Sequence, residues 1–146
     1  MHACSYEISA HSTASPERVF ELLADATSWP QWAGSLTRHG SWQREGAPPP
    51  GGVGAIRKLG RWPMYGREEI VAYEPPTHLA YTIVKGQPVR NYRADVTLTL
   101  VPDGTLITWA GTFDPLIPGT GGLMTAFFRR IIGRFANGLA DHAAKR

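Results

Sequence analysis

Two alternating segments flank Asp103-Gly104, and they constrain the fold more than any other feature of the chain. An Asp-Gly pair is a favoured two-residue turn between antiparallel strands. With that turn, the register predicts that Leu98 pairs with Trp109 and that Ala94 pairs with Phe113. The apolar side chains of both strands then share one face, which indicates an antiparallel sheet with one buried face.

Alternation and apolar content predict further strands before this hairpin. Prolines and glycines at 45–54 and 114–122 predict loops. The expected strands lie at residues 5–14, 36–43, 54–60, 65–73 and 79–84.

Helical signals occur near both ends of the chain. Ser15 can cap a helix that begins at Pro16, and the segment 29–32 predicts a second short helical turn. Residues 122–143 predict one long amphipathic helix. Because glycine is unfavourable inside a helix, Gly133 and Gly138 predict a bend or a close approach to a neighbour.

The order of these elements predicts an α+β domain spanning residues 1–146. One apolar sheet face must be covered, and only the helix at 122–143 is long enough to cover it. We therefore expect a curved antiparallel sheet of about seven strands, in the order β-αα-β6-α, wrapped around the C-terminal helix. Space between sheet and helix would form a cavity for a ligand.

Composition and motifs exclude several classes of protein. Cys4 is the only cysteine, so a disulfide framework and a cysteine-rich metal site are excluded. No apolar run reaches about 18 residues and no signal-peptide pattern is present, so we expect a cytoplasmic protein without a membrane span. The histidines lack metal-ligand spacing and 119–122 lacks the ending of a phosphate loop, so no cofactor is expected. A net charge of +3 does not indicate nucleic acid.

Four segments carry a resemblance to a known superfamily: SPERVFELLADATSWPQW (15–32), GVGAIRKL (52–59), YEPPTHLAYTI (73–83) and DGTLITWAGTFDP (103–115). Through them the chain resembles START-like, or Bet v 1-like (SRPBCC), proteins. More narrowly it resembles small bacterial proteins of the polyketide cyclase/dehydrase and lipid-transport type. The resemblance implies a helix-grip fold and an internal cavity for lipids, polyketides or other hydrophobic compounds.

Three functions are compatible with this interpretation. The first is a carrier or sensor that binds a small hydrophobic molecule between the sheet and the C-terminal helix. The second is an enzyme of the polyketide cyclase or dehydratase type, in which cavity tyrosine and arginine side chains orient the substrate. The third is a module that binds a protein partner, and a homodimer is left open.

Candidate cavity-lining residues follow from alternation together with the resemblance, and no catalytic role is assigned to them. Trp109 and Phe113 could form an aromatic wall for a ligand or ordinary core, and core is favoured. Tyr81 and Tyr92 need hydrogen-bond partners, either on a ligand or within the protein. The candidates are Trp32, Tyr65, Arg67, Tyr81, Tyr92, Leu98, Trp109, Phe113, Met124 and Phe128.

The segment 65–73 leaves its inward face undecided. Tyr65 and Arg67 lie on one face, whereas Glu68 and Ile70 lie on the other. If Arg67 pointed inward, it could bind a ligand carboxylate or polarise a ketone, but a buried charge would need a partner. Arginine is seldom fully buried, which favours a solvated face for Arg67.

A small basic cluster lies on the expected last helix, at Arg129, Arg130 and Arg134. It could contact acidic lipids or a protein partner. Three arginines are few for a nucleic-acid footprint, and an ordinary solvated helix face is favoured.

Overall fold

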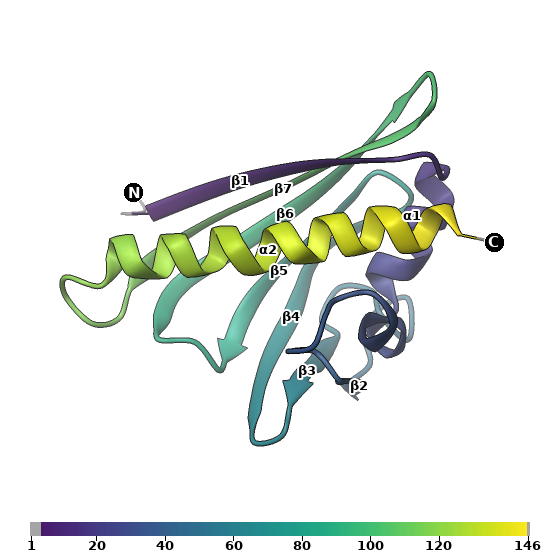
Figure 1. The fold of residues 1–146 in the computed structure, drawn as a ribbon. Coiled ribbons are helices and arrows are strands. Elements are labelled where there is room, and N and C mark those ends of the chain that lie inside the picture. The colour runs from purple at the N-terminus through teal and green to yellow at the C-terminus, as the bar shows by residue number, and fades with distance from the viewer. Residues whose placement is uncertain (1–3, 146) are drawn as a thin grey trace.

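The computed structural model describes residues 4–145, and within them one seven-stranded antiparallel sheet curves around a long helix (Figure 1). The strand order is β1-β7-β6-β5-β4-β3-β2. The strands are β1 (Cys4–Ser12), β2 (His39–Arg44), β3 (Ile56–Arg61), β4 (Met64–Glu74), β5 (His78–Lys85), β6 (Val89–Val101) and β7 (Gly104–Pro115). The helices are α1 (Pro16–Ala24), the 3-10 helix η1 (Ala26–Gln31) and α2 (Gly121–Ala144). The expected α+β helix-grip architecture is therefore confirmed.

Side-chain caps determine where the two short helices begin. The Ser15 hydroxyl accepts a hydrogen bond from the Arg18 backbone N–H at 3.2 Å, with Pro16 at the first helical position, as the sequence predicts. The Asp25 carboxylate accepts from the Thr27 N–H at 3.0 Å and caps η1. Because of this second cap, η1 begins at Ala26, three residues earlier than the expected turn at 29–32.

The hairpin of β6 and β7 exists, but its expected register is wrong by two residues. Leu98 pairs with Ile107 rather than with Trp109, and the two-residue loop is Pro102-Asp103. Proline in the second place and glycine in the fourth are favoured in a β-turn, and Gly104 takes that fourth place. A shift of two residues preserves the side-chain alternation, so Trp109 stays buried on the inner face.

The structure decides which face of β4 points inward. Ile70 is buried, and Glu68 points into the protein toward a buried arginine. Arg67 lies on the outward side, where its Nε donates to the Gln43 side-chain oxygen at 2.7 Å. A β-bulge just after Ile70 shifts the alternation, and Tyr73 packs edge-on against the core.

Two glycines of α2 differ in the space around them, one being closely packed and the other open, so substituting them should change stability in opposite directions. A Cβ at Gly138 would lie 2.0 Å from the Trp32 carbonyl oxygen, so Gly138 permits the close approach of the segment after η1. A Cβ at Gly133 meets nothing within 4 Å, so the expectation of a close neighbour is wrong there.

We therefore expect Gly133→Ala to raise the free energy of unfolding by about 0.5–1 kcal/mol, because alanine is the better helix former. Gly138→Ala should lower it by about 1–3 kcal/mol, because the backbone of 32 must move. Urea unfolding measures the change in unfolding free energy for each variant. Equal changes in the two variants would contradict the close packing at Gly138.

His78 lies on the outer face of the sheet between two carboxylates. Its Nδ1 is 2.6 Å from a Glu74 oxygen and its Nε2 is 2.7 Å from an Asp95 oxygen. Partial burial by itself lowers the pKa of His78, but the hydrogen bonds to Glu74 and Asp95 outweigh it, and the net pKa is raised above 6.5. The protonated imidazole is therefore the form that stabilises the fold.

The raised pKa of His78 gives an expected pH dependence. Its stabilising contribution is complete below the ordinary pKa of 6.5 and is lost as the pH rises through the higher folded-state pKa. We expect the difference in unfolding free energy between the wild type and His78→Gln to shrink as the pH rises from about 6 to 8.5. Urea unfolding across that range measures it, and a constant difference would contradict the role of the imidazolium.

Candidate functional site

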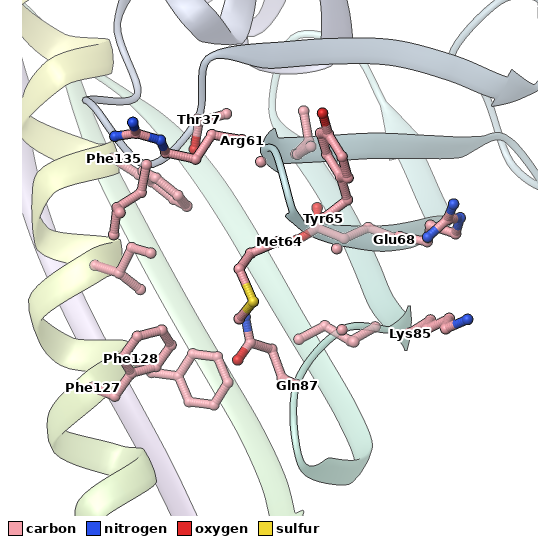
Figure 2. A pocket seen from close by; sticks show the side chains of 18 of the residues that line it. Thr37, Arg61, Met64, Tyr65, Glu68, Lys85, Gln87, Phe127, Phe128 and Phe135 are labelled. Carbon is pink, nitrogen blue, oxygen red and sulfur yellow. The ribbon is translucent and has the colours of Figure 1, made fainter.

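A cavity of about 640 Å³ lies between α2 and the part of the sheet formed by β3, β4, β5 and β6. Its volume falls in the range of small-molecule sites, about 300–1,000 Å³. Figure 2 shows Phe127, Phe128 and Phe135 of α2 on one side, across from Met64 and Gln87 on the sheet side. The apolar lining consists mainly of Leu59, Met64, Ile83, Phe127, Phe128, Ile131, Ile132 and Phe135.

The cavity exists because α2 does not cover the sheet evenly. The helix packs closely on β1 and β7, at one edge of the sheet. The sheet then curves away toward β3 and β2, as Figure 1 shows, and their inner face stands further from the helix. Side chains from both sides project into the gap without filling it.

A buried ion pair lies at the inner end of this space. The Arg57 side chain is fully buried, and its Nε donates to Glu68 Oε1 at 2.9 Å. Its guanidinium carbon lies 4.5 Å from the ring centroid of Trp29 and 4.9 Å from that of Tyr81. Arg57 Nη1 also donates to the Leu23 carbonyl at 3.3 Å. Aromatic faces and hydrogen bonds together offset the cost of burying this cation.

The Glu68 carboxylate is hydrogen-bonded through one of its two oxygens. Arg57 Nε and Nη2 both lie 2.9 Å from Oε1, although Nη2 is not aligned for a hydrogen bond. Among residues 4–145, no group donates to Oε2. The Glu68 side chain is 16% exposed and lines the cavity. Burial raises the pKa of the Glu68 carboxyl, and the Arg57 charge opposes that rise.

Two buried phenols lie beside the carboxylate. Tyr92 shares a hydrogen bond with the Tyr6 hydroxyl, and Trp109 Nε1 donates to the Tyr81 hydroxyl at 3.1 Å. These phenols therefore have partners within the protein, which the sequence left undecided. Burial raises the pKa of both Tyr81 and Tyr92. Near neutral pH both stay protonated, so they can donate or accept hydrogen bonds but do not act as phenolate bases.

The structure divides the predicted lining residues into two groups. The cavity is lined by Tyr65, Arg67, Tyr81, Tyr92 and Phe128, although the Arg67 guanidinium lies on the outward side of β4, where its Nε donates to Gln43. Buried in the surrounding core, outside the cavity lining, lie Trp32, Leu98, Trp109, Phe113 and Met124. Alternation identifies the inward face of a strand but not the point at which the helix stops packing directly on it. That is why the second group contacts other core side chains instead of the open space.

Sequence reasoning missed the most distinctive pair of the site. Arg57 and Glu68 were not among the candidates, yet the structure places them at its inner end. The available signal was alternation, since Arg57 shares a face with Leu59 in a strand of otherwise mixed polarity. Strand pairing brings Arg57 directly opposite Glu68, which the sequence of either strand alone does not reveal.

Among the described residues, no three or more His, Cys, Asp or Glu side chains are arranged so that they could hold a metal ion. None of their helices is long and apolar enough to cross a membrane. The charged side chains of the lining are Glu68 inside and Arg61, Arg67 and Lys85 toward the surface. The arrangement can therefore hold an apolar body beside one internal carboxylate and two tyrosine hydroxyls.

Comparison with known proteins gives a consistent assignment. Residues 3–144 match the family described as polyketide cyclase/dehydrase and lipid transport. An uncharacterized protein of Mycobacterium tuberculosis is 33% identical over 97 residues, covering 64% of this chain and 56% of that protein, so the match spans about half the relative's length.

Solved structures share the fold at low sequence identity. A START superfamily protein from Mycobacterium smegmatis superposes with a TM-score of 0.79 at 12% identity, covering 95% of this chain and 96% of the other. The protein Ara h 8.0201 has a TM-score of 0.73 at 17% identity, again covering 95% and 96%. At these identities the likeness concerns the fold alone.

Proposed function

Because the chain belongs to the polyketide cyclase/dehydrase and lipid-transport family, we propose that it binds a small hydrophobic molecule in the cavity beneath α2, as a carrier or sensor. The observation that supports this function is the open volume of about 640 Å³, whose walls are mainly aromatic and aliphatic. A lipid, a polyketide or another aromatic compound has the matching chemistry. Its apolar body would lie between the phenylalanines of α2 and the inner face of β3–β5.

The polar end of the cavity indicates how such a ligand would be oriented. The Glu68 side chain lines the cavity, and no described residue donates a hydrogen bond to its Oε2, so a ligand hydroxyl could donate to this carboxylate. The neighbouring Arg57 guanidinium is paired with Glu68 and packed against Trp29 and Tyr81, and Arg57 does not line the cavity. A ligand carboxylate would therefore meet Glu68 rather than a free cation. The proposed ligand is neutral at its inner end.

A cyclase or dehydratase activity is the second candidate, and Glu68 is the observation that favours it. A carboxyl whose pKa is raised by burial is suited to general acid or base catalysis near neutral pH. Protonated Tyr81 and Tyr92 could hydrogen-bond a substrate carbonyl. Turnover separates the two candidates: a wild-type enzyme should convert its substrate and Glu68→Gln should bind it without converting it, whereas a carrier should release its ligand unchanged in both forms.

Native mass spectrometry of the purified protein, followed by denaturing extraction, tests the binding function. We expect a co-purifying hydrophobic mass of small-molecule size. Ile131→Trp places a large side chain in the cavity and should reduce ligand capture at least about tenfold. Arg129→Trp is the control, because it introduces the same tryptophan at an exposed position of α2.

The two variants separate a cavity effect from a general effect on folding. Both should remain folded by circular dichroism, and only Ile131→Trp should lose ligand. Ligand binding in this cavity would be disproved if no compound from a panel of lipids and aromatic polyketides bound to the wild type or to Arg129→Trp. It would also be disproved if Ile131→Trp bound ligand as well as those two proteins do.

A further inference from the structure

Large apolar side chains are exposed around the opening of the cavity. Trp62 and Met64, at the β3–β4 turn, are 80% and 73% exposed, while Leu36 and Phe127 are 46% and 38% exposed. All four line the same cavity, although they come from three separate segments of the chain. We call these four residues the mouth surface. Exposed apolar side chains gathered at one place mark an interaction site.

Cations border the mouth surface. Arg61 and Lys85 line the same cavity, and Arg130 and Arg134 lie beside Leu36 and Phe127 in an adjoining groove. All four cations are exposed, and none of them forms an ion pair with another residue of 4–145.

Carboxylates do not balance these charges. The acidic residue of the cavity lining is Glu68, which is committed to Arg57 at the inner end. The rim therefore combines exposed apolar side chains with uncompensated positive charge.

We propose that the mouth surface docks onto an anionic lipid membrane. Tryptophan is favoured at the boundary between lipid headgroups and acyl chains, and Trp62 projects there from the tip of a turn. Arginine and lysine beside it are attracted to anionic headgroups, each strengthening binding roughly fivefold. The positive rim is the feature that selects an anionic membrane over an uncharged apolar partner.

The position of the docking surface suits a cavity with apolar contents. Met64, Gln87 and Phe127 line the cavity in Figure 2, and Met64 and Phe127 are among the exposed residues of the mouth surface. A molecule docked through this surface would therefore bring its cavity against the lipid. A hydrophobic molecule could then pass between membrane and cavity without crossing water. Docking and cavity binding are separate properties, and each can fail without the other.

The opposite end of the sheet provides a matched control. In an antiparallel meander successive turns alternate between two ends, so the β6–β7 turn lies at the end away from the β3–β4 turn (Figure 1). Leu100, next to that turn, is 74% exposed and resembles Met64 in exposure. Leu100→Ser removes an exposed apolar side chain without touching the mouth surface.

Vesicle flotation tests the proposal with the full chain. Vesicles of phosphatidylcholine with phosphatidylglycerol should carry the protein, vesicles of phosphatidylcholine alone should carry much less, and added salt should release it. The variant Trp62→Ser/Met64→Ser should bind anionic vesicles at least about tenfold more weakly. Arg130→Glu/Arg134→Glu should abolish the preference for anionic lipid, and Leu100→Ser should bind like the wild type.

Thermal unfolding establishes that every variant is folded before it is compared. The proposal is overturned if the wild type does not float with anionic vesicles at low salt. It is also overturned if Trp62→Ser/Met64→Ser floats like the wild type, or if binding is the same with and without anionic lipid. A dimer in solution that the same double variant dissociates, together with no vesicle binding, would assign the surface to a second copy instead.

Discussion

Replacing Glu68 by Leu should lower the free energy of unfolding by about 3–5 kcal/mol, because it leaves the Arg57 guanidinium buried without its counter-charge. Arg57 is fully buried against Trp29 and Tyr81, and arginine cannot release its proton to escape the penalty. The remaining polar contact, to the Leu23 carbonyl at 3.3 Å, is too weak to replace a carboxylate. Urea unfolding measures the change.

Two further variants test whether the unpaired buried charge causes this loss of stability. Arg57→Met/Glu68→Leu removes both charges and should recover most of the lost stability, since apolar replacement of a whole buried pair is often neutral. Glu69→Leu removes the neighbouring carboxylate, which faces Arg44 at 3.6 Å on the exposed side, and should cost less than about 1 kcal/mol. A Glu68→Leu protein as stable as the Glu69→Leu control would contradict the burial of Arg57.

Replacing Trp109 by Ala should also cost about 3–5 kcal/mol of unfolding free energy. Its indole is fully buried and packs near Trp29 and Phe135, with ring centroids 6.0 Å away in each case. The substitution opens a hole in this aromatic cluster and removes the N–H that donates to the Tyr81 hydroxyl. Chemical unfolding of the purified variant measures the loss.

Trp62→Ala is the control for the tryptophan substitution, because Trp62 is 80% exposed. It should change the unfolding free energy by no more than about 0.5 kcal/mol. If Trp109 formed a wall of the cavity instead of core, its loss would cost less stability and would weaken ligand capture more. Equal stability of the two alanine variants would therefore disprove the assignment of Trp109 to the core.

Much of the fold follows from short-range patterns in the sequence. The Ser15 cap, the alternation of β5, β6 and β7, and the apolar stripe of α2 each depend on residues close together in the chain. Local sterics and hydrogen bonds act over the same short range, so these elements could be predicted. The resemblance to a known superfamily then supplied their arrangement around the helix.

The turn between β6 and β7 shows where local reasoning fell short. Asp103-Gly104 is a strong turn signal, yet Pro102 competes with it and takes the position that proline favours. The two choices differ in register by two residues and leave the same side chains on the same faces. The hydrophobic pattern therefore could not discriminate between them.

The sequence by itself determined the elements, the inward face of most strands and the need for a helix to cover the sheet. Only the tertiary structure decided which inward residues border open space, because that depends on how α2 lies over a curving sheet. The same is true of Arg57 and Glu68, which are brought together by the pairing of β3 with β4. Periodicity specifies a direction for each side chain, whereas a cavity and a buried ion pair depend on distances between segments that only packing sets.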